Sequence, residues 1–268
     1  MKQRVITALL LAPLVLAGIL WLPTAALMAL VAAALLGGVW EWTRLVGIGS
    51  HSGRALILLA HAAPMAWLAW YGWPALFPWV ALAGVVWWGL ALLWLRFPAF
   101  GKAQSLANRA LKLGVVALLV IPAWCAFALL HAESAAWALY GLMLVWAADT
   151  FAYFSGRRFG GAKLAPSISP GKTWAGFWGG LFGVVVLALA MAPVLGVAVA
   201  QLPAFVAISL VAGLASVLGD LFESLIKRHA GAKDSGALLP GHGGMLDRID
   251  SILAALPVFA IFKAWFGL

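Results

Sequence analysis

Long apolar stretches alternate along the chain with short polar segments, and this pattern predicts membrane-spanning helices. Each stretch approaches the roughly 20 residues that an α-helix needs to cross a bilayer. Because backbone groups in lipid must satisfy their own hydrogen bonds, we expect every stretch to be helical. Nine spans are predicted, at residues 5–22, 24–42, 55–72, 75–95, 113–130, 135–154, 174–192, 202–222 and 249–267. The expected fold class is an all-α polytopic membrane protein.

The composition agrees with this fold class. Only 9% of the residues are charged and 65% are hydrophobic, whereas a soluble domain carries about 25% charged residues. Such a chain could not cover a water-facing surface. The stretch after Met1 looks superficially like a signal peptide, but we interpret it as the first spanning helix. The single cysteine, Cys125, excludes an internal disulfide and a cysteine-based metal site.

The distribution of Lys and Arg predicts the orientation. With the N-terminus in the cytoplasm, 16 of the 17 basic residues fall in cytoplasmic segments, and only Lys263 lies outside. This is the bias that membrane insertion produces. It also accounts for the net charge of +9 without nucleic acid as a partner. We therefore expect an odd number of spans, with the C-terminus on the far side.

Polar residues divide the chain into two regions. Residues 1–110, with about four helices, contain almost no polar functionality and are assigned a scaffold role. Residues 111–268, with about five helices, form the expected catalytic region, with cytoplasmic loops at 155–173 and 223–248.

Acidic residues concentrate on the cytoplasmic side. Of eight, Glu41 is interpreted as a surface pair with Arg44 or an interface residue, and Glu133 as a solvated residue in an outside loop. The other six lie at cytoplasmic span ends or in the last cytoplasmic loop: Asp149, Asp220, Glu223, Asp234, Asp247 and Asp250. Ionisable groups near a bilayer are costly, so six that converge on one face indicate a functional site.

Helical spacing groups these residues further. One face of the eighth predicted helix carries residues at i, i+3, i+4 and i+7, namely Asp220, Glu223, Ser224 and Lys227. Asp247 and Asp250 share a face of the ninth, and Asp149 ends the sixth at the same depth. Four aspartates from three helix ends suit Mg²⁺. One or two histidines beside so many aspartates do not indicate zinc.

Basic residues and glycines accompany the aspartates. The stretch contains Lys227, Arg228, Lys233 and Arg248, together with Gly231, Gly236, Gly241, Gly243 and Gly244. Alternating charges can simply balance one another. Combined with glycines, which let backbone N–H groups approach phosphate, they favour a site for a polyanion. Cationic side chains and metal-bound carboxylates recur in the active sites of enzymes that catalyse phosphoryl and nucleotidyl transfer.

A second polar loop, Arg157–Thr173, contains Ser169, Lys172 and Thr173. Its Gly-Lys-Thr tripeptide is not a P-loop, because Pro166 stands where the first glycine belongs and no strand precedes it. The loop opens a helix whose N-terminus favours an anion. An ordinary basic cytoplasmic loop is the alternative interpretation. Gly176 and Gly180 in that helix predict close helix packing.

The residues from 224 to 250 resemble the signature of phosphatidate cytidylyltransferases. They read Ser224-Leu-Ile-Lys227-Arg228, Lys233-Asp234 and Pro240-Gly-His242-Gly243-Gly244-Met-Leu-Asp247-Arg248-Ile-Asp250. Asp149-Thr150 with Ser169-Pro170-Gly171-Lys172-Thr173-Trp174 is similar to the second cytoplasmic motif of the family, although Ala175 replaces a polar residue. The motifs cover roughly the last 120 residues, and the first 110 match only in hydropathy.

The resemblance implies a reaction in which CTP and phosphatidic acid give CDP-diacylglycerol and pyrophosphate. It also implies Mg²⁺, in a two-cation site whose second ion is unknown, and a homodimer in the bacterial inner membrane. The residues expected to be catalytic are Asp220, Ser224, Lys227, Arg228, Lys233, Asp234, His242, Asp247, Arg248 and Asp250. Those expected to bind CTP or lipid phosphate are Asp149, Ser169, Lys172, Thr173, Lys227, Arg228, Gly243 and Gly244. The expected metal ligands are Asp220, Asp247, Asp250 and Asp149.

Three other functions are weighed against this one. An ion-coupled transporter could use clustered carboxylates, but transporters place them near the bilayer midplane in repeat-related broken helices. A CDP-alcohol phosphotransferase would carry an Asp-Gly-x-x-Ala-Arg pattern, which is absent. A purely structural membrane protein would not need six converging carboxylates.

Overall fold

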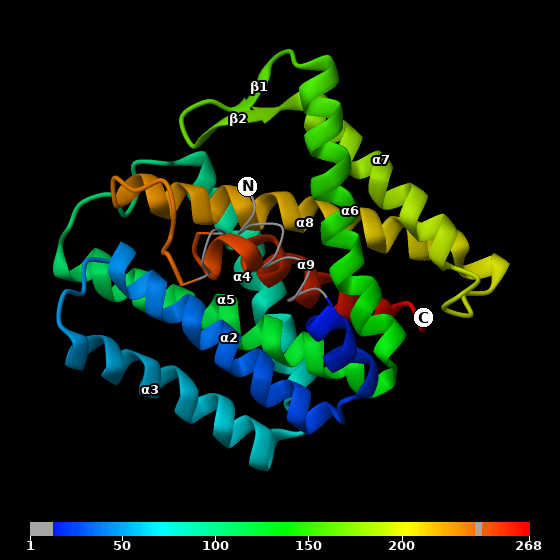
Figure 1. Cartoon of the computed structure of the whole chain (residues 1–268), viewed down its shortest axis with the longest axis horizontal. Helices are drawn as coiled ribbons and strands as arrows, with labels where there is room; N and C mark the ends of the chain where they lie inside the picture. The colour runs from blue at the N-terminus through cyan, green and yellow to red at the C-terminus, as the bar shows by residue number, and fades with distance from the viewer. Residues whose placement is uncertain (1–12, 239–242) are drawn as a thin grey trace.

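The computed structural model describes residues 13–238 and 243–268, and these form a bundle of long helices (Figure 1). A helical segment at 13–21 comes first. The helices that follow are α2 (Thr24–Leu45), α3 (His51–Trp67), α4 (Phe77–Arg96), α5 (Leu106–Glu133), α6 (Ala135–Phe159), α7 (Trp174–Met191), α8 (Leu202–His229) and α9 (Leu246–Trp265). The π-helical turn η1 (Leu68–Gly72) extends α3, and the 3₁₀ turn η2 (Val199–Gln201) leads into α8.

Seven of the described helices are long and apolar enough to cross a membrane. They are α2 to α8, with η1 and η2 included in α3 and α8. The predicted fold class is therefore confirmed. The ninth predicted span is α9, which carries charged residues in its first and last turns. The first predicted span lies partly outside the described residues.

The loop after α6 contains a β-hairpin that the hydropathy pattern did not predict. Strands β1 (Lys163–Ala165) and β2 (Ser169–Thr173) pair antiparallel, with Lys163 opposite Thr173. The hairpin lies between the end of α6 and the start of α7 (Figure 1). Gly160 and Gly161, with φ of 60° and 86°, allow the turn out of α6 that begins it. The all-α description thus holds for the spanning helices but not for this loop.

Glycines bring α6 and α7 into close contact, as predicted. A Cβ atom on Gly176 would lie 2.9 Å from the carbonyl oxygen of Ala152, and one on Gly180 would lie 2.9 Å from that of Ala148. Larger residues at these positions would separate the helices. The hairpin joins α6 to α7, and Arg228 at the end of α8 donates to the carbonyl oxygen of Ile168 in the hairpin turn.

The predicted scaffold helices pack directly on the core of the predicted catalytic region. The Phe222 ring of α8 is fully buried, and it contacts Trp42 of α2 and three tryptophans of α4 at centroid distances of 5.5 to 6.5 Å. The indole N–H of Trp88 donates to the carbonyl oxygen of Leu253 in α9 (3.1 Å). These contacts tie the first helices to the helices that carry the acidic residues.

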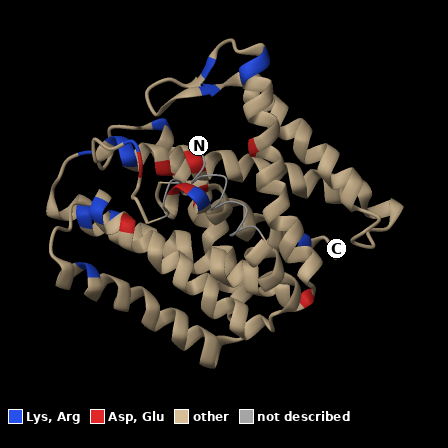
Figure 2. Ribbon diagram, viewed as in Figure 1, with Lys and Arg blue, Asp and Glu red and all other residues tan. Residues whose placement is uncertain are grey.

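Basic residues gather mainly at the left and top of the bundle in Figure 2. Lys263, the predicted exception to the charge bias, is 2% exposed and pairs with Glu133 at 2.6 Å. Its ammonium lies 4.3 Å from the centroid of the Trp137 ring and also donates to the Leu268 carbonyl. Glu133 is therefore the partner of a buried cation, and the interpretation as a merely solvated residue was wrong. Neither α5 nor α9 reveals this pair by itself, because the two residues lie 130 positions apart.

Candidate active site

The acidic face predicted on α8 is present. The Ser224 hydroxyl donates to Asp220 Oδ1 at 3.2 Å, and Lys227 forms an ion pair with Glu223 one turn earlier. Successive turns of one helix thus place an acceptor, a hydroxyl, a buried carboxylate and an ammonium along one line.

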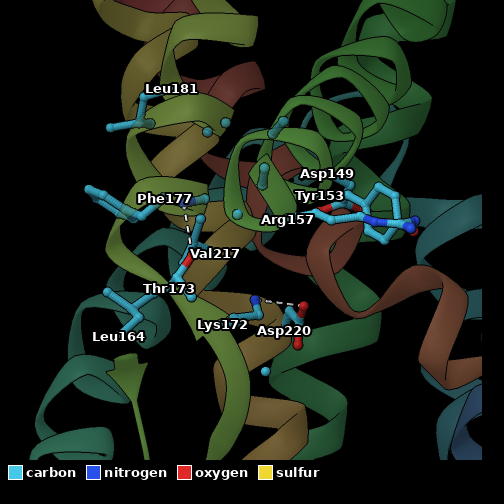
Figure 3. A pocket seen from close by; sticks show the side chains of 17 residues that line it. Asp149, Tyr153, Arg157, Leu164, Lys172, Thr173, Phe177, Leu181, Val217 and Asp220 are labelled. Atoms are coloured by element: carbon cyan, nitrogen blue, oxygen red, sulfur yellow. Dashed lines mark hydrogen bonds and ion pairs between the residues drawn. The ribbon is translucent and has the colours of Figure 1, made fainter. Parts of the chain in front are cut away.

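The hairpin adds a cation to this face. Lys172 of β2 pairs with Asp220 Oδ2 at 2.6 Å, and both side chains are about a quarter exposed, at 25% and 29% (Figure 3). Asp149 of α6 and Asp250 of α9 both lie within electrostatic range of Asp220. Asp149 and Asp250 are therefore close enough to Asp220 for their charges to interact, although they belong to α6 and α9.

Asp247 occupies a different place, at the start of α9. It accepts hydrogen bonds from Lys227 Nζ (2.7 Å) and from the backbone N–H groups of Ser235 (3.1 Å) and Gly244 (3.0 Å). Burial raises the pKa of Asp247, but Lys227 and the two N–H donors outweigh burial and hold the pKa below its ordinary value. Asp247 is therefore ionised and organises the segment between α8 and α9. Its predicted role as a metal ligand stays a prediction.

Lys227 lies between two carboxylates. Its side chain is 12% exposed and pairs with both Glu223 and Asp247. The Glu223 carboxylate is 4% exposed and, among residues 13–238 and 243–268, has no hydrogen-bond partner besides this ion pair. The predicted contact of Lys227 with substrate phosphate is not visible in this arrangement. What the structure shows is a buried three-member charge network that joins α8 to α9.

The remaining predicted residues fall into two groups. Arg228 bonds to the carbonyl oxygens of Ile168 (3.1 Å) and Ala232 (3.2 Å), so it ties the hairpin loop to the end of α8. Thr173 caps α7 by accepting the N–H of Gly176 at 3.1 Å. The others differ only in exposure: Ser169 and Gly243 are partly buried, and the exposed ones are Lys233, Asp234 and Arg248. His242 lies outside the described residues.

A cavity of about 570 Å³ opens beside Lys172 and Asp220, bounded by α6, α7, α8 and the hairpin. Figure 3 shows polar side chains on one side, with Asp149, Lys172 and Asp220, and apolar ones on the other, with Phe177 and Leu181. Tyr153 and Arg157 complete the polar side and are bonded to each other at 3.1 Å. Such a cavity can receive a molecule that has both an anionic and an apolar part.

The residues at this point suit a hard cation. Carboxylate oxygens are the protein ligands that Mg²⁺ prefers, and it commonly takes one or two of them together with substrate phosphates. Asp220 offers such oxygens, and Asp149 and Asp250 lie within electrostatic range of it. Across residues 13–238 and 243–268, no three His, Cys, Asp or Glu side chains already enclose a metal position. An ion bound here would therefore need phosphate or water oxygens as well.

Glu41 has contacts that sequence reasoning missed. The predicted pair with Arg44 is wrong, because both side chains reach the segment after α8 instead. Glu41 accepts from Ser235 Oγ at 2.9 Å, and Arg44 donates to the Ser235 carbonyl oxygen at 2.7 Å. The signal that could have indicated this was the presence of a carboxylate among apolar residues at the end of α2.

Comparison with known proteins identifies the family. A family model described as "Cytidylyltransferase family" matches residues 2–266. The chain belongs to this family. A cytidylyltransferase is a nucleotidyltransferase, so the predicted enzyme class is confirmed and the transporter alternative is not supported.

Two relatives match this cytidylyltransferase over nearly their whole length. The phosphatidate cytidylyltransferase of Pseudomonas aeruginosa is 44% identical over 97% of this chain and 96% of its own length. That of Haemophilus influenzae is 38% identical over 98% of each chain. The Thermotoga maritima protein of the same name is 44% identical over 48% of this chain. The predicted family is confirmed, and the similarity extends into the first 110 residues, where only hydropathy had matched.

Proposed function

We propose that this protein transfers the cytidylyl group of CTP to phosphatidic acid, giving CDP-diacylglycerol and pyrophosphate. The observation that carries the proposal is the cavity beside Lys172 and Asp220. It has charged groups on one side and apolar side chains on the other, within a bundle of membrane-spanning helices. A lipid phosphate and a water-soluble nucleotide could both reach such a place. The names of the full-length relatives support the same substrates.

In the proposed reaction, a phosphate oxygen of phosphatidate attacks the α-phosphorus of CTP. The bond from that phosphorus to the oxygen bridging to the β-phosphate breaks, and pyrophosphate leaves. The attacking phosphate is already anionic near neutral pH, so the protein need not supply a strong base. Its contribution is to orient the two substrates and to offset the negative charge that they bring together.

The side chains have distinct tasks in this scheme. Lys172 presents its ammonium to the cavity from a hairpin that Arg228 anchors to α8, which suits contact with the triphosphate. Lys227 holds Glu223 and Asp247 together and so preserves the geometry of α8 against α9. Ser224 orients Asp220 through its hydrogen bond.

Mg²⁺ belongs to the proposal. Asp220, Asp149 and Asp250 would hold it, with Asp247 as the predicted fourth ligand. Bound there, the cation would neutralise negative charge on the reacting phosphates. The identity of a second cation stays open to experiment.

The direct test uses purified protein with CTP, Mg²⁺ and phosphatidate vesicles. We expect CDP-diacylglycerol and pyrophosphate in equal amounts, and neither product when diacylglycerol replaces phosphatidate. CTP hydrolysis without lipid dependence, or ion uptake into proteoliposomes without any cytidylyl transfer, would refute the proposal.

We further propose that the site faces the cytoplasm of the bacterial inner membrane and that the protein is a homodimer. The charge bias of the predicted loops supports the orientation, and the family resemblance supports the dimer. A topology reporter fused after Leu268 should be located on the side of the membrane opposite the cytoplasm. A monomeric mass in mild detergent and in native lipid discs would contradict the dimer.

A further inference from the structure

Glu41 lies on α2, in the region assigned a scaffold role, yet its carboxylate reaches the segment that joins α8 to α9. The residue is only 3% exposed. Its Oε2 atom accepts hydrogen bonds from Ser235 Oγ and from the backbone N–H of Leu246, both at 2.9 Å. Oε1 accepts a longer bond from the N–H of Leu238 (3.4 Å). One carboxylate therefore holds the described parts of this segment at both of its ends.

The bond to Leu246 fixes the start of α9. Leu246 is the first residue of α9, and the first N–H groups of a helix have no partner within the helix. Met245, at the N-cap, offers no side-chain acceptor. Glu41 supplies the missing acceptor from another helix, and its negative charge suits the positive end of the helix dipole. The residue after Leu246 is Asp247.

Ser235 connects Glu41 to Asp247. Its hydroxyl donates to Glu41, and its backbone N–H donates to Asp247 at 3.1 Å. Its carbonyl oxygen accepts from Arg44, the neighbour of Glu41 on α2. One of the donors that hold Asp247, the Ser235 N–H, is thus placed by side chains of α2.

Two of the glycines in the signature make room for this carboxylate. A Cβ atom on Gly236 would overlap the Glu41 carboxylate, and one on Gly244 would lie 2.5 Å from its Oε2 atom. In the described parts of the chain, neither glycine has a positive φ. The absence of a side chain, rather than a left-handed backbone, is therefore what these positions require. Both glycines make room for Glu41, and the approach of phosphate to this stretch stays a prediction.

We propose that Glu41 is a positioning residue for the cytidylyl transfer, acting through Ser235 and Leu246 on Asp247; this rests on the function proposed above. Glu41→Ala should lower kcat by about 100-fold, the size of effect that a displacement of roughly 1 Å at a reaction centre produces. The KM values for CTP and phosphatidate should stay within about threefold, because Glu41 lines no part of the cavity beside Lys172.

Two variants separate positioning from general damage. Glu41→Gln keeps the length of the side chain and one carbonyl oxygen for Ser235 and Leu246, so its kcat should stay within about fivefold of the parent. Thr43→Val is the matched control. Thr43 lies on the same helix and is fully buried, and its hydroxyl donates to the Trp40 carbonyl and accepts from Arg54, without touching the segment. Thr43→Val should leave kcat near the parental value.

A double substitution tests the contact itself. Gly236→Ala alone should displace Glu41 and lower kcat about as far as Glu41→Ala does. Added to Glu41→Ala, it should cost little more, because the atoms it would overlap are gone. Each variant is purified in detergent, its Tm is measured to show that it is folded, and kcat and both KM values are determined.

Three results would overturn the proposal. In the first, a folded Glu41→Ala variant loses no more kcat than Thr43→Val. In the second, Glu41→Gln lowers kcat as far as Glu41→Ala does. In the third, the kcat losses of Glu41→Ala and Gly236→Ala add up in the double variant. Failure of the parent protein to make CDP-diacylglycerol would instead refute the proposed function, so the two failures can be told apart.

Discussion

Replacing Lys227 with Met should destabilise the protein strongly. Lys227 pairs with both Glu223 and Asp247, so one cation offsets two carboxylates. Their side chains are 4% and 11% exposed, so solvent can screen neither charge well. Removing one partner of a buried ion pair costs about 3–5 kcal/mol, because the other charge is left without compensation. Asp250 lies within electrostatic range of Glu223 and adds to the repulsion.

The assay is thermal unfolding of the purified variants in one detergent. A loss of about 3–5 kcal/mol corresponds to a Tm decrease on the order of 10 °C for a chain of this size. Lys163→Met, at an exposed position of strand β1, is the control, and its Tm should not change measurably. Lys227→Met combined with Glu223→Gln should recover part of the loss, because it removes one of the two stranded charges.

The reasoning would be refuted by a Lys227→Met variant whose Tm stays within about 2 °C of the parent. That result would mean that water reaches the three side chains freely, so that the network contributes as little as a surface ion pair. A double variant that is less stable than Lys227→Met would also contradict it.

Three further predictions concern activity and the far side of the bundle. Lys172→Ala should mainly raise the KM for CTP in steady-state assays; a change confined to the KM for phosphatidate would contradict its assignment. Asp247→Asn should lower kcat by at least about 100-fold while the protein still inserts and dimerises, as membrane fractionation and mass measurement can show; near-normal turnover would remove Asp247 from the metal site. Glu133→Gln should lower Tm and leave kcat unchanged, because Lys263 is 2% exposed and the neutral amide would no longer offset its buried charge. An unchanged Tm in that variant would show that the Glu133 pair does not stabilise the protein.

The sequence was sufficient for features that depend on local pattern. Hydropathy over about 20 residues predicted the seven described helices that are long and apolar enough to span a membrane, because a bilayer imposes the same requirement on every spanning helix. Helical spacing placed Asp220, Ser224 and Lys227 on one face, and the structure shows them so arranged. The signature between residues 224 and 250 led to the family. Each of these inferences uses residues that are close together along the chain.

The tertiary structure decided which of those groups meet. Glu41 and Ser235 are separated by 194 positions, and Lys263 and Glu133 by 130, so no local pattern could pair them. Lys227 shares a face of α8 with Glu223, but only the packing of α8 against α9 brings it into contact with Asp247 as well. A charged residue in an apolar chain is expected to have a partner, because burying an unpaired charge is costly. Which partner it finds depends on how distant helices pack, and only the folded chain determines that.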